Sequence, residues 1–424
     1  MSGAGLYDEL AWRGLVSDAT DGLREAFAAG PVTGYIGFDP TADSLHVGSL
    51  LTMIGLARLQ RFGHLPIAIV GGGTGMIGDP KPTQERPLLS RDDIERNVAG
   101  IRPQLARLLD FDSRTNPARI VNNADWLASF DLLGFLRDTG KYFTVNYLLQ
   151  KEAVSRRLGS DEGISFTEFS YPLLQARDYL ELFDRHGCTL QMGGSDQWGN
   201  ITAGIDLVRK LRAARVHGLV WPLLTTSAGT KFGKTEAGTV WLDAARTSPF
   251  KFHQFWLNTD DRDVVRYLKF FTFMTREEIE LLAAEAAAHP EQRVAQRALA
   301  RAVTALVHGD DQVDRAERAA LVLFGGSFDG VAADDIMTVF EDAPSTEIDL
   351  PAEGSTAVEL LTTTGLAPSR SEAMRLVKGG GVYVNNARVA DEKARFTGAD
   401  AIGGEIFVLR KGRKDQHIVR LRRG

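Results

Sequence analysis

The sequence predicts an α/β fold with a parallel sheet, followed by an all-α domain and a small α+β domain. Three observations predict this order. An apolar strand at 34–38, a helix over 45–62 and a second apolar strand at 65–70 succeed one another, as in a βαβ unit with a right-handed crossover. Residues 247–325 then carry amphipathic helical runs without glycine motifs. Two short helices follow residue 353, and after them a strand at 382–384 turns at Asn385 and Asn386 into residues 387–389.

Length sets the domain organisation, because a chain of 424 residues is too long for one ordinary core. We expect a parallel-sheet domain at 1–246 that contains an insertion at 124–190. A helical domain at 247–330, an acidic linker at 331–352 and a final domain at 353–424 are expected to follow.

Composition excludes several classes of protein. The formal charge of −6 gives no global sign of nucleic-acid binding, so any such affinity must be local. The single cysteine, Cys188, excludes an internal disulfide, fits a reducing compartment and is expected to be an inert apolar side chain. No apolar run approaches the roughly 20 residues that span a bilayer, and residues 1–5 lack a signal-peptide pattern. We therefore expect a cytoplasmic protein without membrane attachment.

The predicted helix over 45–62 begins behind a strand, with N-cap chemistry supplied by Asp43 and Ser44. Its first turn carries the tetrad His-Val-Gly-Ser, where backbone N–H groups and the helix dipole favour a phosphate. His46 adds a side-chain donor, and Gly48 removes the side chain that would block a nucleotide. We therefore predict a Rossmann-like nucleotide-binding domain that binds ATP.

The second strand leads into a glycine-rich loop at 71–80. Gly73, Gly75 and Gly78 match a dinucleotide fingerprint, so a nicotinamide site is an alternative. That fingerprint should open directly into a helix, whereas two prolines follow here and indicate a loop. We therefore expect the glycines to let backbone approach a ligand, with the carboxylate of Asp79 beside it.

Further polar residues follow strands or share a helix face. Asn123 lies just past a predicted strand at 118–122, at the edge where α/β sheets bind ligands. Tyr171, Gln175 and Asp178 fall at i, i+4 and i+7 of a predicted helix and therefore on one face. Three polar groups amid apolar neighbours favour a recognition surface over packing.

Two later motifs each leave an alternative open. Gly194 and Asp196 follow another strand, and the carboxylate either accepts from ribose hydroxyls or forms a plain helix N-cap. Lys231 and Lys234 lie in a glycine-flanked loop suited to a polyphosphate, although a solvated basic turn would read the same way. The loop is no Walker A motif, because Ala228 stands where that motif needs glycine.

Taken in order, these motifs resemble those of bacterial tyrosyl-tRNA synthetases, which are class I aminoacyl-tRNA synthetases. The tetrad at 46–49 is similar to the family's first signature, and Lys-Phe-Gly-Lys-Thr at 231–235 to its second. Residues 356–412 resemble the S4 RNA-binding domain at the C-terminus of this family. The basic residues at 410–423 agree with a module that meets a phosphate backbone, the alternative being a solubilising tail.

The resemblance implies that tyrosine attacks the α-phosphate of ATP to give tyrosyl-adenylate, and that the tyrosyl group then passes to the 3′ end of tRNA(Tyr). It implies ATP as a substrate with Mg²⁺, no tightly bound cofactor and no protein-ligated metal. The residues expected to stabilise the phosphate charge are His46, Ser49, Lys231, Lys234 and Thr235. The other residues expected to bind ATP are Gly37, Asp39, Thr41, Gly48, Thr52, Gly194 and Asp196. The residues expected to bind tyrosine are Tyr35, Asp79, Asn123, Tyr171, Gln175, Asp178 and Gln197.

By the same resemblance, Tyr35 and Asp178 bracket the phenol hydroxyl of the substrate, one mainly donating and one accepting. Phenylalanine would leave both groups buried and unpaired, a rule for which this family is itself the standard illustration. No editing domain is then required. The chain departs from the family at Ser49, where a second histidine is common, and at Ile36, where some members have a polar side chain.

Two alternatives remain. Tryptophanyl-tRNA synthetases share the fold and signatures, but an indole would not need groups placed for a hydroxyl. A non-catalytic RNA-binding protein that reuses the fold would be expected to lose signature residues, which this chain keeps. The family further implies a homodimer with tRNA lying across both subunits, and residues 130–166 are the expected interface.

Overall fold

The computed structural model describes residues 5–79, 89–159, 163–227, 229, 232–235, 238–323, 326–328, 331, 333–341, 343–412 and 415–422. The chain forms two compact units. The first comprises Met1–Thr247 with Phe255–Val307, and the second comprises Ser248–Gln254 with His308–Gly424. These units divide the predicted helical region at residue 307 and so differ from the domain boundaries expected from the sequence.

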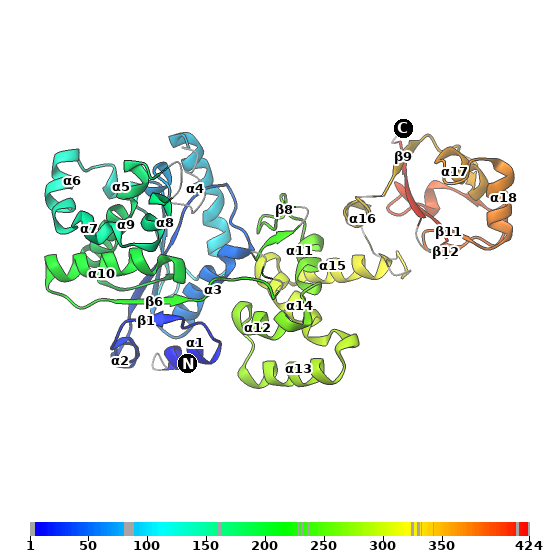
Figure 1. The fold of residues 1–424 in the computed structure, drawn as a ribbon. Helices are drawn as coiled ribbons and strands as arrows, with labels where there is room; N and C mark the ends of the chain where they lie inside the picture. Colours follow the sequence, from blue (N-terminus) through cyan, green and yellow to red (C-terminus); the bar gives the residue numbers. More distant parts are fainter. Residues whose placement is uncertain are drawn as a thin grey trace. The chain divides into compact units, whose positions relative to one another are not determined.

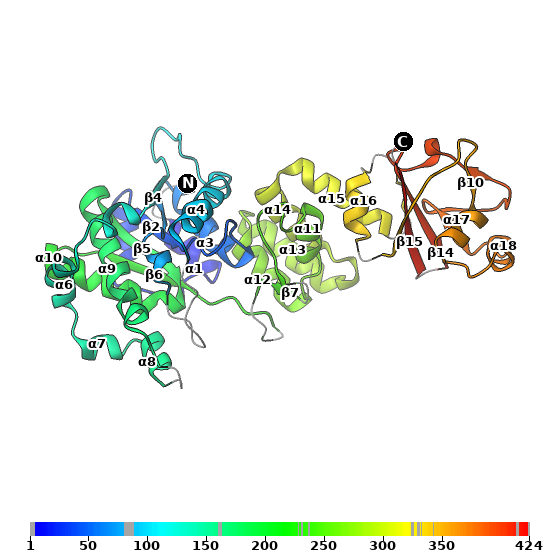
Figure 2. The same ribbon diagram turned by 90° about the horizontal axis from the view of Figure 1, so that it is seen from above.

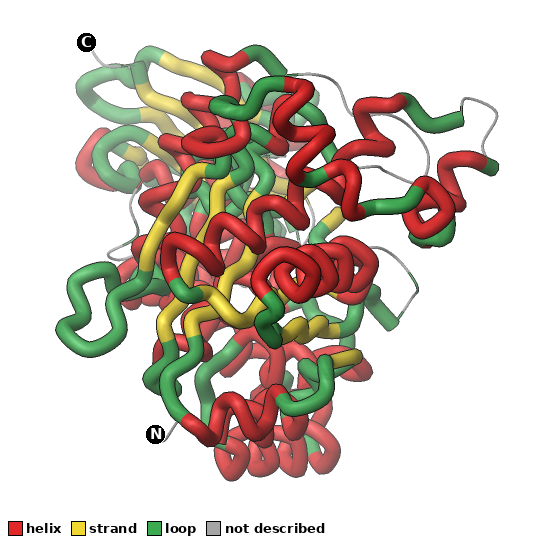
Figure 3. Tube along the Cα trace, turned by 90° about the vertical axis from the view of Figure 1, so that its left-hand side faces the viewer, coloured by secondary structure: helices red, strands yellow, loops and turns green. Residues whose placement is uncertain are grey.

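The first unit contains a six-stranded sheet of order β1-β6-β5-β2-β3-β4, whose strands run side by side (Figure 3). The strands are β1 Asp18–Ala19, β2 Thr33–Phe38, β3 Leu65–Val70, β4 Arg119–Asn122, β5 Cys188–Gly194 and β6 His217–Trp221. All neighbours pair in parallel except β1, which is antiparallel to β6. The strand order reverses between β2 and β5, and such a switch point opens a ligand crevice at the carboxyl ends of the strands. The predicted α/β fold with a mostly parallel sheet is confirmed.

Helices cover both faces of this sheet (Figure 1). Tyr35, Ile67 and Ile69 point into a buried cluster with residues of α9 (Phe166–His186) and α10 (Trp198–Arg212). On the other face α3 (Val47–Arg61) packs so closely that a Cβ at Gly34 would lie 2.9 Å from Leu59. α4 spans Arg91–Ala106 and starts at the N-cap Ser90. The alternating directions of β2 side chains thus place Tyr35 under α9 and leave room for α3 behind it.

Helices α1 (Leu6–Trp12) and α2 (Leu23–Ala29) precede β2 and are separated by β1. One prediction about this amino-terminal part was wrong in detail. The N-cap of α3 is His46 and not Asp43 or Ser44. The Ser44 hydroxyl donates to the Leu45 carbonyl instead and accepts from the side chain of Gln104.

Between β4 and β5 the chain forms an insertion of short helices. They are α5 Ala124–Leu127, α6 Leu132–Asp138, α7 Val145–Leu149 and α8 Glu152–Leu158, which lead into α9. Short 3₁₀ helices are η2 Thr74–Met76, η3 Gly140–Tyr142 and η4 Ser195–Gln197. Large apolar side chains remain exposed along α6 to the start of α9, namely Leu132, Leu133, Leu136, Val145, Leu149, Leu158 and Phe166.

The region after β6 begins with a hairpin of β7 (Lys234–Thr235) and β8 (Gly238–Thr239) and is then helical. Its helices are α11 Pro249–Leu257, α12 Asp261–Phe271, α13 Arg276–Ala288, η5 Pro290–Gln292, α14 Val294–His308 and α15 Asp310–Leu323. The expected helical region is confirmed as to its secondary structure.

The second unit carries a five-stranded sheet of order β12-β11-β14-β15-β9. Its strands are β9 Ser345–Ile348, β11 Val382–Val384, β12 Ala387–Arg388, β14 Ile406–Lys411 and β15 Asp415–Leu421. Figure 2 shows the two long strands β14 and β15 side by side. A two-stranded sheet joins β10 (Ser355–Thr356) to β13 (Arg395–Phe396), and η6 spans Gly398–Asp400. Helices α16 (Ala333–Val339), α17 (Ala357–Thr363) and α18 (Arg370–Lys378) complete the unit.

The stretch at 331–352, expected as a linker, is structured where it is described. It contains α16, whose Ile336 is fully buried, and β9, which pairs in parallel with β15. The acidic composition of this stretch favoured a linker, although a few of its apolar side chains enter the core. The expected turn at Asn385 and Asn386 joins β11 to β12, and both residues adopt positive φ angles of 49° and 59°.

Candidate functional site

A cavity of about 420 Å³ opens at the carboxyl ends of β2, β3 and β5, where the strand order reverses. Its walls come from β2, the glycine loop after β3, the first turn of α3, one face of α9 and the start of η4. Most residues that the sequence nominates for a site line this one cavity. They are Tyr35, Gly37, Asp39, Thr41, His46, Gly48, Ser49, Thr52, Asp79, Asn123, Tyr171, Gln175, Asp178, Gly194, Asp196 and Gln197.

Tyr35 and Asp178, which are 1% and 3% exposed, are two of the deeply buried polar residues that line the cavity. The Tyr35 hydroxyl has no hydrogen-bond partner among the described residues. Its ring packs edge-on against Tyr179 with centroids 5.3 Å apart. Burial, followed by the negative charge of Asp178, holds the pKa of the Tyr35 hydroxyl well above its usual value. Tyr35 therefore stays a neutral hydroxyl that can donate or accept.

Asp178 is held in place by two donors. Its Oδ2 accepts from Asn123 Nδ2 at 2.9 Å, and its Oδ1 accepts from the indole Nε1 of Trp126 at 2.8 Å. Burial raises the pKa of the Asp178 carboxyl to about 7, while these two hydrogen bonds oppose the rise. The carboxylate is thus fixed in direction and close to its titration point at neutral pH.

Asn123 connects Asp178 with the glycine loop after β3. Besides its bond to Asp178, its Nδ2 donates to Thr74 Oγ1 at 2.9 Å, and its Oδ1 accepts from the backbone N–H of Gly73 at 2.7 Å. All hydrogen-bonding positions on this side chain amide except one oxygen lone pair are then used. The loop at 71–79 is therefore tied to the residue that orients Asp178.

A second polar group gathers around Asp79. Its Oδ2 accepts from Gln197 Nε2 at 3.0 Å, and its Oδ1 accepts from Asn200 Nδ2 at 3.4 Å. Asn200 also donates to Gln197 Oε1 at 3.2 Å. Farther along the wall, the Tyr171 hydroxyl donates to Asp39 at 3.3 Å. The carboxylates of Asp39 and Asp79 and the amide of Gln197 therefore line one side of the cavity, with Asn200 behind them.

Trp126 and Asn200 hydrogen-bond to residues of the site but were not predicted from the sequence. Asn200 is three residues after Gln197, so helical spacing places it beside that side chain. Trp126 precedes its partner Asp178 by 52 residues, so no local pattern marks it. The only sequence signal was its position just past the end of β4.

The first turn of α3 presents the tetrad to the cavity. His46 is the N-cap residue, and its ring lies over Gly48, where a Cβ would come within 2.7 Å of the imidazole. Glycine is therefore required at 48 to seat the ring. Thr52, one turn on, donates to the Ser49 carbonyl at 2.5 Å. The first backbone N–H groups of a helix lack partners within it and suit an anion.

The second signature lies against the first. Gly233 adopts a positive φ of 81°, and a Cβ there would come within 2.7 Å of Val47. Val47 in turn donates its N–H to the carbonyl of Val240 at 3.0 Å. Phe232 lines the cavity and is buried. Lys231 and the side chains of Lys234 and Thr235, all expected in the site, lie outside the described part of the chain.

Within the described ranges, no group of three or more His, Cys, Asp or Glu side chains is arranged to hold a metal ion. Among the helices that the structure describes, none is long and apolar enough to cross a membrane.

Two family models match most of the chain. The model of the class I tRNA synthetases (W and Y) matches residues 28–325, and that of the tyrosine–tRNA ligase SYY-like C-terminal domain matches residues 335–419. Tyrosine–tRNA ligase from Roseiflexus castenholzii is 53% identical over 98% of this chain and 99% of its own length. The same enzyme from Bacillus caldotenax is 50% identical, again over 98% of this chain and 99% of its own length.

Solved structures agree with the fold. A C-terminally truncated mitochondrial tyrosyl-tRNA synthetase from Aspergillus nidulans is 34% identical, with a TM-score of 0.68 over 75% of this chain and 94% of that one. A tryptophanyl-tRNA synthetase from Encephalitozoon cuniculi, at 15% identity, reaches a TM-score of 0.51 over 73% of this chain and 87% of that one, and shares the fold alone. With two family models that together match most of its length, and with full-length relatives at about half identity, the chain belongs to the tyrosyl-tRNA synthetases, a family of class I aminoacyl-tRNA synthetases.

Proposed function

We propose that the cavity of the first unit carries out both steps of a tyrosine–tRNA ligase. The chain activates L-tyrosine with ATP to tyrosyl-adenylate and then transfers the tyrosyl group to the 3′ end of tRNA(Tyr). The observation that carries this assignment is the buried pair of an unpartnered tyrosine hydroxyl and an oriented carboxylate at the deep end of the cavity. Such a pair is costly without a ligand and matches a phenol hydroxyl in size and polarity.

At this deep end the phenol hydroxyl of the substrate donates to Asp178 and accepts from Tyr35. Asp178 is already directed by Asn123 and Trp126, so substrate binding needs little reorganisation of the carboxylate. Phenylalanine would leave the Tyr35 hydroxyl and the Asp178 carboxylate without that partner inside a buried pocket. A missing hydrogen bond to a buried charged group is penalised more heavily than a missing apolar contact.

The charged end of the amino acid meets the polar wall of the cavity. Asp79, Tyr171 and Gln175 receive the α-ammonium, with Asp79 supplying the opposite charge. Gln197 stands beside Asp79 and lies near the substrate carboxylate. This arrangement leaves the carboxylate directed toward the amino end of α3, where a nucleotide phosphate is favoured.

ATP occupies the part of the cavity between α3 and the end of β5. Thr52 and Asp196 hold the ribose, while backbone at Gly37, Gly48 and Gly194 allows the nucleotide to approach. The remaining residues assigned to ATP are Asp39, Thr41, His46, Ser49, Lys231, Lys234 and Thr235. ATP enters as its Mg²⁺ complex, with the ion carried by the phosphates.

In the first step an oxygen of the tyrosine carboxylate attacks the α-phosphorus, and the bond to the bridging oxygen breaks as pyrophosphate leaves. Negative charge grows on the α-phosphate and on the leaving group. His46, Ser49, Lys231, Lys234 and Thr235 stabilise that charge, which is a larger contribution to rate than any acid or base at this site. In the second step a terminal ribose hydroxyl of tRNA attacks the tyrosyl carbonyl carbon, and AMP leaves.

We infer the oligomeric state and the cellular compartment of the protein from two further features. The exposed apolar side chains along α6 to the start of α9 are too many for a solvated face, and we assign them to the interface of a homodimer across which tRNA binds. A single, fully buried cysteine fits a reducing compartment, and we assign the enzyme to the cytoplasm.

ATP–pyrophosphate exchange tests the proposal, with tyrosine, phenylalanine and tryptophan assayed side by side. We expect exchange with tyrosine alone, and loss of the preference over phenylalanine in Asp178→Asn. Asp184→Asn is the control, because Asp184 lies in the same helix, pairs with Arg212 and does not line the cavity. Exchange with tryptophan would exclude the phenol assignment. Absence of exchange with any amino acid, in a protein that still binds tRNA, would favour a non-catalytic role.

A further inference from the structure

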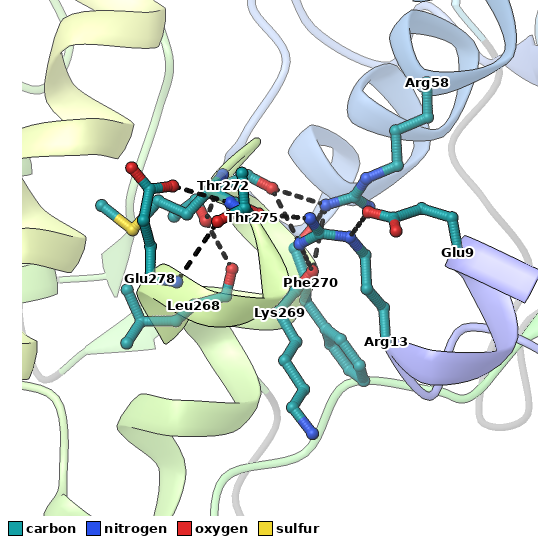
Figure 4. Close-up of polar contacts among 10 residues, drawn as sticks. Glu9, Arg13, Arg58, Leu268, Lys269, Phe270, Thr272, Thr275 and Glu278 are labelled. Atoms are coloured by element: carbon teal, nitrogen blue, oxygen red, sulfur yellow. Dashed lines mark hydrogen bonds and ion pairs between the residues drawn. The ribbon is translucent and has the colours of Figure 1, made fainter. Parts of the chain in front are cut away.

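Two buried arginines hold the carboxyl end of helix α12 (Figure 4). Arg58 of α3 donates through Nη2 to the carbonyls of Lys269, Phe270 and Thr272 at 3.0, 2.9 and 2.8 Å. Arg13, just past α1, donates through Nη1 to Lys269 and Thr272 at 2.8 and 3.1 Å. Segments far apart in the sequence therefore meet at the end of one helix.

The chemistry of a helix end explains this arrangement. The last carbonyls of an α-helix have no partner within the helix and carry partial negative charge, which cations stabilise. Glu9 balances Arg13 through a 2.5 Å ion pair, but no carboxylate is hydrogen-bonded to Arg58 among the described residues. Arg58 also keeps a buried Nη1 without a partner among those residues. Burying a guanidinium that is held mainly by carbonyls carries a large desolvation cost. The net gain in stability is therefore small, and we infer that Arg58 is needed to fix the position of α12.

The side of α12 that faces α11 holds the aromatic residue of the second signature. Phe232 stacks on Phe271 at 5.3 Å and meets the edge of Tyr267 at 5.1 Å. Phe255 and Trp256 of α11 complete the enclosure, with centroids 5.6 and 5.8 Å away. Phe232 is thus the anchor of its loop, and its place depends on where α12 lies.

The loop that Phe232 anchors returns to α3. Gly233 follows it directly and lies against Val47 and the backbone of Gly48, on the first turn of α3. Arg58 is on the same helix, about three turns later. The amino end of α3 therefore contacts the second signature directly, at Gly233. Farther along α3, Arg58 is connected to Phe232 of that signature indirectly, through α12.

We propose that Arg58 is a positioning residue for tyrosine activation. Its hydrogen bonds to Phe270 and Thr272 fix α12 against α3, and α12 in turn sets Phe232, so that Gly233 of the loop that Phe232 anchors lies at the amino end of α3. Arg58 is not among the residues that line the cavity and contacts no reacting group. The proposal rests on the proposed role of that loop in stabilising phosphate charge.

The test separates position from stability. In Arg58→Met the side chain keeps its length and loses its donors. Active-site titration, which counts sites that form tyrosyl-adenylate, gives the concentration against which kcat is expressed. We expect kcat for pyrophosphate exchange per titrated site to fall by about 10- to 100-fold. The KM for tyrosine should stay unchanged, because its pocket is built by β2 and α9 and not by α12.

Arg61→Met is the matched control. Arg61 lies three residues on in α3, is exposed, and reaches the same segment by stacking 3.5 Å over the ring of Phe273. The exchange rate of Arg61→Met per site should stay within about twofold of the parent, because a substitution on the surface that breaks no buried hydrogen bond has a small effect. An unchanged kcat per site in Arg58→Met, with only a lower unfolding temperature, would overturn the proposal and leave Arg58 a structural residue.

The kcat per titrated site of Phe232→Leu is a second, independent measurement. It tests the role of the anchor even if Arg58→Met does not fold. If both residues act through one anchor, the double variant should lose no more activity per site than the more impaired single variant. Additive losses would overturn the proposal. Arg58→Lys keeps a charge but cannot reach several carbonyls at once, and should show the same fall. Failure of the parent protein to exchange with tyrosine would instead refute the proposed function, so the two failures are distinguishable.

Discussion

The indole nitrogen of Trp126 donates a 2.8 Å hydrogen bond to the carboxylate of Asp178, across 52 residues of sequence. The bond joins a short helix after β4 to the helix that carries three of the residues assigned to tyrosine. It is directed at the oxygen opposite the one that Asn123 holds. The carboxylate assigned to the substrate hydroxyl is therefore oriented by α5 and its N-cap residue Asn123, and of these two donors only Asn123 was expected in the site.

The first prediction concerns pH. Burial raises the pKa of Asp178 to about 7, and the ionised form is the one that accepts the substrate hydroxyl. As pH falls through 7 the carboxyl takes up a proton, so kcat/KM for tyrosine should decline on the acidic side. A pH profile of kcat/KM in pyrophosphate exchange measures the pKa in the free enzyme. A profile that stays flat from pH 8 to pH 6 would contradict this role for Asp178.

Trp126→Phe should move that profile. The side chain stays aromatic, although it is smaller than the indole, and the charged form of Asp178 loses one donor. A hydrogen bond to a charged group contributes about 1.5 kcal/mol or more, which corresponds to roughly one pKa unit. We expect the acidic limb for tyrosine to shift upward by about that amount. Trp221→Phe is the control, because Trp221 also lines the cavity but packs over Gly55 on the other face of the sheet.

Gly48→Ala should impair ATP use and spare tyrosine binding. The new methyl group would come within 2.8 Å of two imidazole atoms of His46, so the ring must leave its place beside the first turn of α3. We expect the rate of adenylate formation to fall by about tenfold or more. Equilibrium binding of tyrosine, measured without ATP, should match that of the parent. Equal losses in both measurements would indicate a general distortion of the cavity.

Leu133→Asp should break the proposed dimer. Leu133 is 77% exposed on α6, within the apolar surface assigned to the interface. Burying a carboxylate at the centre of an apolar interface is strongly unfavourable. Sedimentation velocity should give a dimer for the parent and a monomer for the variant at the same concentration. Leu281→Asp, at 72% exposure on α13, should remain a dimer, and a monomeric parent would refute the assignment.

Much of the fold could be predicted because its signals are local. Strand β3 has the predicted bounds, since an unbroken apolar run ends at glycines on its carboxyl side. The helical spacing of Tyr171, Gln175 and Asp178 brings all three to one cavity, because α9 is regular over that stretch. Such patterns depend on neighbours within a few residues, and a single sequence contains them.

The remaining features depend on partners distant in sequence. Ser44 was expected to cap α3, yet its hydroxyl is engaged by Gln104, so His46 takes the N-cap position. Trp126 looked like an ordinary residue after a strand until α9 placed Asp178 against it. In the acidic stretch at 331–352 the composition predicted a linker, but Ile336 packs in a buried cluster with residues of β14 and β15. In each case the tertiary contact overrides the local signal.

The parallel pairing of β9 with β15 has a consequence for how the carboxyl-terminal module can be isolated. A fragment that starts at residue 353 would lack β9 and would leave the backbone of Ile418 to Leu421 without its neighbour. An uncovered strand edge is a template for pairing with other chains. Such a fragment should self-associate, whereas one that begins before α16 keeps its edge covered, so the natural limit of the module lies upstream of its two helices α17 and α18.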